Sequence, residues 1–334
     1  MANLYLTEQN SILRKSGDRL IIEKDDAVLL EVQCHKIEAV LIFGNVQFTT
    51  QVVHELFEHG IEMAIFTRTG RLVGQITSPS PKNIMLRIQQ FKKYWDKDFR
   101  LVFSKAVVTG KLRNGLTLLR QFAYNHPDAD IKNQMAQIED SIRTVDKATA
   151  PDQLNGVEGN AARAYFDAFG RMILGDLVFP GRKKRPPPDP VNAMLSLSYT
   201  MIFNEISSLL DGIGFDPYLG YYHEADYGRA SLAADLMEEF RAPVAERFVL
   251  YLVNNRIFKQ EDFYANPKGG IYFTTEAMKR YFAEYERMID REFIHPETKE
   301  TSTLRKAFRF QAEKMAHVLQ DDRPYIPFIL DEKG

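Results

Sequence analysis

The sequence predicts an α+β protein in which a small β-rich N-terminal domain precedes a larger all-α domain. Short apolar runs separated by turn residues fill residues 1–77, which is typical of strands. Beyond residue 84 the apolar residues recur with the 3.6-residue period of helices. Ser78–Pro81 reads SPSP, and proline continues neither a helix nor a strand ladder. We therefore expect domains over 1–77 and 85–334, joined by a linker over 78–84.

Within the N-terminal region, turn signals separate the expected strands. Ser11–Glu23 contains two β-prone runs around Gly17-Asp18, a pair of residues that favours a hairpin turn. Gln51–His59 instead has helical spacing and ends at Gly60, a residue type that commonly stops a helix. Further strands are expected over Val28–Val32, Ile37–Phe43, Ile61–Phe66 and Arg71–Thr77.

In the C-terminal region, start signals and prolines define the expected helices. Asn155 is predicted to cap the N-terminus of a helix that carries Glu158. Prolines exclude a helix over Val178–Pro190, which we expect to be an extended basic loop. Asp189 and Pro190 then form the cap and the first turn of the helix that follows. Helices are expected over Ile84–Tyr94, Ser104–Asn125, Ile131–Val145, Val191–Leu210, Val244–Asn254 and Leu304–Leu319, with a short extended piece at Gly269–Phe273.

Composition excludes several classes of protein. The 334 residues are 45% apolar and 12% aromatic, which suits a folded protein with a sizeable core. The net charge of −2 gives no sign of nucleic-acid binding by the whole chain, so any basic surface must be local. The single cysteine, Cys34, excludes an internal disulfide and a zinc cage built of cysteines. Neither a secretory signal nor an apolar run of ~18 residues is visible, so we expect a cytoplasmic protein without membrane contact.

The segment Tyr221–Arg241, YYHEADYGRASLAADLMEEFR, carries the residues that best indicate chemistry. His223 lies just before an expected helix with Asp235 and Glu238, whose side chains share one face because they are three residues apart. Glu158 lies in NGVEGNAAR, where small residues leave room for a close approach. One imidazole and two or three carboxylates suit a hard divalent cation. Bound Mg²⁺ or Mn²⁺ activates an oxygen nucleophile and stabilises a phosphodiester under attack.

Each of these residues also has a purely structural interpretation. Asp235 and Glu238 could form the solvated face of an amphipathic helix, and Glu239 and Glu246 are expected to be solvated in this way. Glu158 could be a first-turn acid that interacts with the helix dipole. The histidine could be a surface or packing residue. Spacing alone leaves both interpretations open.

Two groups of basic residues are candidates for binding DNA phosphates. Arg182, Lys183, Lys184 and Arg185 precede three prolines that hold them extended, an arrangement that suits a phosphate backbone. The loop could also be a solubilising segment. A second basic group, interleaved with aromatic residues, runs through residues 87–120. It could be a binding face or the polar side of amphipathic helices.

Taken together, three segments resemble one family, the metal-dependent DNA integrase and endonuclease of CRISPR spacer acquisition. They are GVEGNAAR around Glu158, RKKRPPPDPVNAMLSLSYT over Arg182–Thr200, and HEADYGRASLAADLMEEFR over His223–Arg241. The segment VTGKLRNGLTLLRQF, with Lys111 and Asn114, is similar to an earlier helix of the family. The β-rich start and the helical remainder match the family architecture over nearly the whole chain.

The resemblance implies a Mg²⁺ or Mn²⁺ site formed by Glu158, His223 and Glu238, with Asp235 as an auxiliary acid. It implies DNA cleavage, and attack of a DNA 3′-hydroxyl on a phosphodiester of the CRISPR repeat, which joins foreign double-stranded fragments to the array. It also implies a homodimer, which the β-rich domain with its exposed strand edges could support, and a small ferredoxin-like CRISPR adaptation partner. Contacts to DNA are expected from Arg182, Lys183, Lys184, Arg185, Lys111 and Arg163.

Other functions stay open on the sequence. A plain metal-dependent nuclease would cleave DNA without joining it. A non-catalytic scaffold would bind DNA in a salt-sensitive way that is indifferent to chelators and to the acidic residues. A small-phosphoester hydrolase is less favoured, because the chain has no glycine-rich phosphate loop such as GxxxxGKS.

Overall fold

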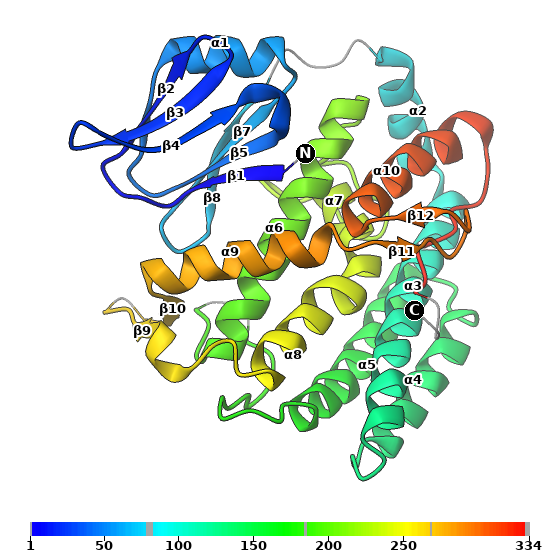
Figure 1. The fold of residues 1–334 in the computed structure, drawn as a ribbon. Helices are drawn as coiled ribbons and strands as arrows, with labels where there is room; N and C mark the ends of the chain where they lie inside the picture. Colours follow the sequence, from blue (N-terminus) through cyan, green and yellow to red (C-terminus); the bar gives the residue numbers. More distant parts are fainter. Residues whose placement is uncertain (1, 78–82, 184–185, 268, 331–334) are drawn as a thin grey trace. The chain divides into compact units, whose positions relative to one another are not determined.

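The computed structural model describes residues 2–77, 83–183, 186–267 and 269–330 (Figure 1). It divides into two compact units, Met1–Ser80 with Glu261–Met288, and Pro81–Gln260 with Ile289–Gly334. The fold class is confirmed, because a strand-rich N-terminal region precedes a mainly helical one. Residues 78–82 of the expected linker lie outside the described part of the chain. The division into domains over 1–77 and 85–334 stays a prediction.

The first unit contains two four-stranded sheets. Its strands are β1 (Ala2–Leu6), β2 (Ile12–Ser16), β3 (Arg19–Lys24), β4 (Ala27–Gln33), β5 (Ile37–Phe43), β6 (Gln47–Phe48), β7 (Glu62–Phe66) and β8 (Leu72–Ile76). One sheet has the order β4-β3-β2-β6 and is antiparallel except for the pair β2 and β6. The other has the order β1-β5-β7-β8, in which only β8 runs antiparallel to its neighbour. The hairpin predicted at Gly17 is confirmed, with Gly17 at a φ of 60°.

Helix α1 (Thr50–Glu58) and the 3-10 turn η1 (Cys34–Lys36) complete the core of this unit. Val52 and Leu56 of α1 pack with Cys34 among the buried strand residues. The segment 261–288 also belongs here, with β9 (Phe263–Ala265), β10 (Ile271–Phe273) and α9 (Thr275–Ile289). The rings of Tyr5 and Phe282 stack with their centroids 4.3 Å apart, which links α9 to the first strand.

The second unit is built mainly of helices. They are α2 (Ile84–Trp95), α3 (Lys97–Asn125), α4 (Lys132–Val145), α5 (Pro151–Arg171), α6 (Pro190–Ile213), α7 (Ser231–Met237), α8 (Arg247–Asn254) and α10 (Leu304–Asp321). A 3-10 turn, η2 (Glu238–Phe240), and a π-helical turn, η3 (Arg241–Glu246), connect α7 to α8. Helices α3, α4 and α5 lie side by side (Figure 1). A two-stranded ribbon, β11 (Phe293–Ile294) with β12 (Thr301–Ser302), means that this region is not wholly α-helical.

Two predicted helix starts have opposite outcomes. Asp189 caps α6 as expected, because its side chain accepts a hydrogen bond from the Asn192 N–H at 2.8 Å. The cap predicted at Asn155 is wrong, since α5 begins at Pro151 and Asn155 lies inside it. Pro151 favours that earlier start, because proline fits the first helical position, where its missing N–H costs no hydrogen bond.

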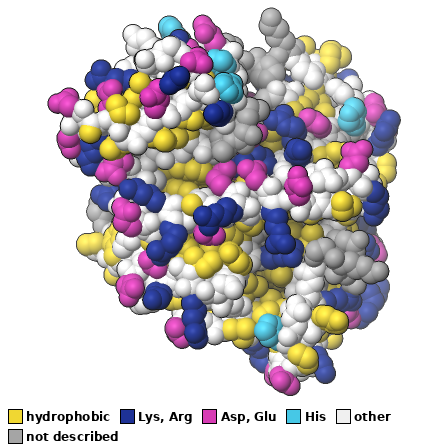
Figure 2. All heavy atoms as spheres, in the orientation of Figure 1, with side chains coloured by type: hydrophobic (Ala, Val, Ile, Leu, Met, Phe, Trp, Pro, Cys, Tyr) yellow, Lys and Arg dark blue, Asp and Glu magenta, His cyan; other side chains and the backbone are white. Residues whose placement is uncertain are grey.

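The surface carries a mixture of charges. Basic and acidic side chains are interspersed over the face drawn in Figure 2, as their nearly equal numbers of 43 and 45 lead one to expect. Within the described residues, no helix combines the length and the apolar character needed to cross a membrane.

Candidate metal and nucleic-acid site

The buried carboxylate of Asp235, on α7, organises the loop that carries His223. Its Oδ2 accepts hydrogen bonds from the backbone N–H groups of Tyr221 and Tyr222 at 2.7 and 3.1 Å. Its Oδ1 accepts from the His223 N–H at 2.8 Å and lies 2.7 Å from the ring Nδ1. Because a carboxylate only accepts, Nδ1 carries a proton, and Nε2 is the ring nitrogen left to bind other groups. Asp235 thus fixes both the position and the tautomer of the imidazole.

A glycine makes this arrangement possible. A Cβ atom on Gly220 would lie 2.8 Å from Asp235 Oδ2 and 2.6 Å from the carbonyl carbon of Ser231. A side chain there would therefore push the loop away from the carboxylate that holds it.

Glu238, in turn η2, presents a second buried carboxylate toward the same imidazole. Its Oε1 lies 4.0 Å from His223 Nε2, and its side chain is 4% exposed. Arg241 Nη1 donates to both carboxylate oxygens at 3.0 and 3.2 Å, and Lys111 Nζ lies 2.7 Å from Oε2. Burial opposes the negative charge, but Arg241 and Lys111 hold the pKa of the Glu238 carboxyl well below its ordinary value.

Glu158, on α5, reaches the same cation from a third segment of the chain. Its Oε1 forms an ion pair with Lys111 Nζ, and its Oε2 accepts a hydrogen bond from the Tyr222 hydroxyl. Burial raises the pKa of this carboxyl, but the Lys111 ammonium and the Tyr222 hydroxyl together outweigh it, so the pKa is lowered. Since Glu158 and Glu238 both contact one nitrogen, their carboxylates lie within two hydrogen-bond lengths of each other.

This set of donors suits a hard divalent cation. Two ionised carboxylates and an imidazole nitrogen are ligands that Mg²⁺ and Mn²⁺ accept. The Lys111 ammonium contacts both carboxylates, so two negative charges converge on one cation. Among the described residues, Glu158, His223 and Glu238 are not a set whose ligand atoms all lie within 4.8 Å of one another. For one cation to bind all three, these ligand atoms would have to move closer together, and Lys111 now pairs with both carboxylates.

A buried polar network lies behind Glu238 and contains Glu246. The Glu246 carboxylate is 3% exposed and accepts hydrogen bonds from the hydroxyls of Tyr165 and Tyr199, each at 2.6 Å. The Arg241 guanidinium lies 4.4 Å from the centre of the Tyr199 ring. The expectation that Glu246 is a solvated helix residue is wrong, because two buried hydroxyl donors hold it in the interior.

The expectation that Glu239 is solvated is also wrong. Glu239 is 2% exposed and accepts hydrogen bonds from the Tyr325 hydroxyl and the Phe328 N–H, both at 2.7 Å. Burial raises the pKa of its carboxyl to about 7. Asn114 on α3 donates to the carbonyl oxygens of Glu239 and Phe328 at 2.7 and 2.8 Å. These bonds tie the C-terminal segment to the turn that carries Glu238.

The residues expected to contact DNA lie in different surroundings. The Arg182 guanidinium turns inward and donates to Asn192 Oδ1 at 2.8 Å, whereas Lys183 is exposed. Arg163 is exposed on α5 and donates to Asn160 Oδ1. Lys111 binds the two acids described above. Lys184 and Arg185 lie outside the described residues, and the DNA contacts of all six side chains stay predictions.

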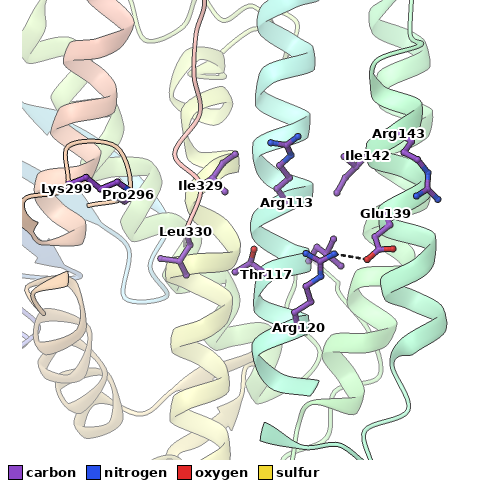
Figure 3. Close-up of a pocket in the computed structure, with 11 residues that line it drawn as sticks. Arg113, Thr117, Arg120, Glu139, Ile142, Arg143, Pro296, Lys299, Ile329 and Leu330 are labelled. Atoms are coloured by element: carbon purple, nitrogen blue, oxygen red, sulfur yellow. Dashed lines mark hydrogen bonds and ion pairs between the residues drawn. The ribbon is translucent and has the colours of Figure 1, made fainter. Parts of the chain in front are cut away.

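A basic groove lies between α3, α4 and the C-terminal segment (Figure 3). Its cavity volume is about 670 Å³, and its lining includes Arg113 and Arg120 of α3 and Arg143 of α4. Arg120 is engaged with Glu139 at 2.8 Å, while Arg113 is exposed. Part of the basic group predicted over 87–120 therefore lines a hollow, and its binding to phosphates stays a prediction.

Sequence reasoning missed two side chains of the acidic cluster. Arg241 has a local signal, because it follows Glu238 by three residues and such pairs meet on a helix. Tyr222 has none, since its contact with Glu158 joins residues 64 positions apart in the chain.

Comparison with known sequences identifies relatives over most of the chain. The family model described as CRISPR associated protein Cas1 matches residues 4–287. A CRISPR-associated exonuclease Cas4/endonuclease Cas1 fusion of Geobacter sulfurreducens is 32% identical over 332 residues, covering 97% of this chain and only 59% of the fusion. A CRISPR-associated endonuclease Cas1 of Thermus thermophilus is 33% identical over 328 residues, covering 97% of this chain and 96% of the relative.

Solved structures share the fold. A casposase bound to its integration product superimposes with a TM-score of 0.88 at 20% identity, covering 99% of this chain and 94% of that one. A chain of a Cas6-RT-Cas1–Cas2 complex superimposes with a TM-score of 0.82 at 27% identity, covering 99% of this chain and 36% of that one. Both units of the present structure are therefore represented in known folds.

Proposed function

Because this chain belongs to the family of CRISPR-associated Cas1 proteins, we propose that it is a divalent-metal-dependent integrase that joins DNA fragments to a CRISPR array. The observation that most supports this function is that three separate segments converge: Glu158 and Glu238 share the Lys111 ammonium, and His223 Nε2 lies 4.0 Å from Glu238 Oε1. The casposase with a similar fold was solved with an integration product, which agrees with joining chemistry.

We assign the metal to Glu158, His223 and Glu238, as Mg²⁺ or Mn²⁺. When bound, the ion stabilises charge on the attacked phosphate and makes a DNA 3′-hydroxyl a better nucleophile. Asp235 holds the imidazole so that Nε2 is directed away from it and is free to coordinate. Tyr222 and Lys111 hold the Glu158 carboxylate in place. Burial of Glu238 and Asp235 keeps water from competing for their hydrogen bonds.

The groove lined by Arg113 and Arg143 and the exposed Lys183 are the surfaces we assign to DNA phosphates. Arg182, which bonds to Asn192 and Ser196, supports the loop rather than reaching outward. In this proposal Arg113, Arg143 and Lys183 contact DNA phosphates, whereas Arg182 stabilises the loop that carries Lys183.

We further propose that the protein works as a homodimer with a small ferredoxin-like partner. Strand β4 is at the edge of its sheet, and its residues Val28, Leu29 and Leu30 are 58, 49 and 47% exposed. An exposed apolar edge strand favours pairing with a second chain. The similar Cas6-RT-Cas1–Cas2 complex contains Cas2 together with Cas1, which supports the existence of a partner.

The direct test is strand transfer of a short duplex with free 3′-hydroxyl ends into a plasmid that carries a CRISPR repeat. We expect branched joined products that require Mg²⁺ or Mn²⁺ and disappear with a chelator or with His223→Ala. His317→Ala, which removes an exposed histidine on α10, is the matched control and should retain joining. Metal-dependent joining by His223→Ala at the wild-type rate would falsify the site assignment. Cleavage without any branched product would instead indicate a plain nuclease.

A further inference from the structure

A second cluster of metal-binding side chains lies in the N-terminal unit, among residues to which the proposed function gives no role. Cys34 Sγ, a carboxylate oxygen of Glu55 and a ring nitrogen of His59 all lie within 4.8 Å of one another. Cys34 begins turn η1, directly after β4. Glu55 lies on α1, and His59 caps its C-terminus four residues later, so their side chains share one face. Two elements of the fold thus place three ligands of different chemistry around one point.

We propose that Cys34, Glu55 and His59 form a structural site for a zinc-class divalent cation. Thiolate, imidazole and carboxylate are the three ligand types of protein zinc sites, and a sulfur ligand disfavours Mg²⁺. Ligand atoms of a tetrahedral zinc site lie ~3.5 Å apart. Glu55 Oε1 and His59 Nε2 are already 3.1 Å apart. Closing the site therefore takes a movement of only ~1 Å by the sulfur or by its partners.

The protons and charges balance on binding. The Cys34 thiol loses its proton to solvent as the metal–sulfur bond forms, and the hydrogen bond between Glu55 and His59 breaks. One thiolate and one carboxylate offset the two positive charges of the cation, and the Lys15 ammonium that stays paired with the carboxylate leaves the bound site with one net positive charge. Burial and the nearby Glu55 charge raise the pKa of the free thiol, whereas a bound cation favours the thiolate.

Lys15 on β2 already orients the carboxylate for this role. Its ammonium forms an ion pair with Glu55 Oε2, which leaves Oε1 on the side of His59. Hydrogen-bonded partners of this kind commonly fix the ligating oxygen of a carboxylate in metal sites. Lys15 therefore acts as a supporting residue and keeps its ion pair when the other oxygen binds the cation.

The histidine side of the cluster is open to solvent. Cys34 is fully buried and Glu55 is 4% exposed, whereas the His59 side chain is 39% exposed. Entry of a cation past the histidine requires no opening of the core. A water molecule on that side completes the four ligands, and the closed site ties turn η1 to the end of α1.

Cobalt(II) titration of the full-length, metal-free protein tests the proposal. Cobalt replaces zinc in such sites, and its bond to a thiolate gives an intense near-ultraviolet charge-transfer band. Because Cys34 is the only cysteine of the chain, that band reports on this site alone, whatever metal the acidic cluster of the other unit binds. We expect one equivalent of Co²⁺ to produce the band and added Zn²⁺ to remove it.

Variants separate a true site from a polar network without metal. Cys34→Ser should abolish the band. Because Cys34 is buried, His59→Gln at the exposed ligand provides a second test that spares the core, and it should weaken Co²⁺ affinity at least tenfold. His54→Gln, a neighbouring exposed histidine of α1 outside the cluster, should bind as the wild type does. Absence of the band in the wild type, or unchanged affinity in His59→Gln, overturns the proposal.

Discussion

Replacing Asp235 with asparagine tests whether one carboxylate holds the imidazole of the candidate site. In the wild type the two carboxylate oxygens accept four hydrogen bonds, three from the N–H groups of Tyr221, Tyr222 and His223 and one from the His223 ring. Asparagine has a single acceptor oxygen, and its NH₂ group must then face two of these donors. Either the peptide N–H groups of the tyrosines or both groups of His223 lose their acceptor.

The size of the effect follows from the bonds lost. Each hydrogen bond to a charged group contributes about 1.5–3 kcal/mol, so losing two should lower the free energy of unfolding by about 3–6 kcal/mol. The side chain is fully buried, so water cannot replace the lost bonds. Releasing the imidazole should also lower metal affinity and joining activity by about 10- to 100-fold, as loss of such an orienting partner usually does.

Urea unfolding, Mn²⁺ titration and strand transfer together measure these effects. Asp226→Asn is the matched control, because Asp226 is exposed in the loop that carries His223 and its side chain accepts a hydrogen bond from the neighbouring Tyr227 N–H. We expect it to change stability by less than about 0.5 kcal/mol. Wild-type stability of the Asp235→Asn protein would refute the orienting role. A destabilised Asp235→Asn protein that still joins DNA at the wild-type rate and binds Mn²⁺ with wild-type affinity would refute it as well.

Three further predictions concern charge. Lys111→Met should lower the free energy of unfolding of the metal-free protein by about 3 kcal/mol, because two ionised carboxylates lose their shared cation. Saturating Mn²⁺ should then raise the Tm of this variant by more than it raises the Tm of the wild type. Equal Tm shifts in the two proteins would argue against a metal at this position. The pKa of Glu238 is lowered in the folded protein, so its charge stabilises the fold above the ordinary pKa of 4.5, and this contribution is lost as the pH falls through the lower folded value. The difference in free energy of unfolding between the wild type and Glu238→Gln, measured with urea, should therefore decrease below pH 4.5. A difference that stays constant with pH would contradict the lowered pKa. Arg113→Ala should weaken DNA binding and reduce the slope of log affinity against log salt concentration by about 0.9, and an unchanged slope would exclude a phosphate contact by this side chain.

Local signals in the sequence predict the elements that depend on near neighbours. The hairpin at Gly17 follows from residues that tolerate a positive φ, and α6 begins where Asp189 caps it. Asp235 and Glu238 both lie next to the His223 imidazole, as their three-residue spacing leads one to expect. Each of these features is determined within a few residues, which is why a single sequence suffices to predict them.

Features that depend on distant contacts could not be predicted in this way. Strand β1 pairs in parallel with β5, so that Leu4 lies beside Val40, and no periodicity specifies such a partner. The grouping of 261–288 with the N-terminal strands is equally non-local. Glu239 looked like a solvated helix residue because its donors, from Tyr325 and Phe328, lie more than eighty residues away. Burial of an acid is set by partners that only the folded chain brings together.

The most direct test of the metal site is anomalous diffraction from a crystal of this protein soaked in Mn²⁺. We expect one peak at coordination distance, roughly 2.0–2.3 Å, from Glu158, His223 and Glu238, with the Lys111 ammonium moved away from at least one carboxylate. Lys111 still bridging both carboxylates, with no manganese peak between these three side chains, would contradict this assignment.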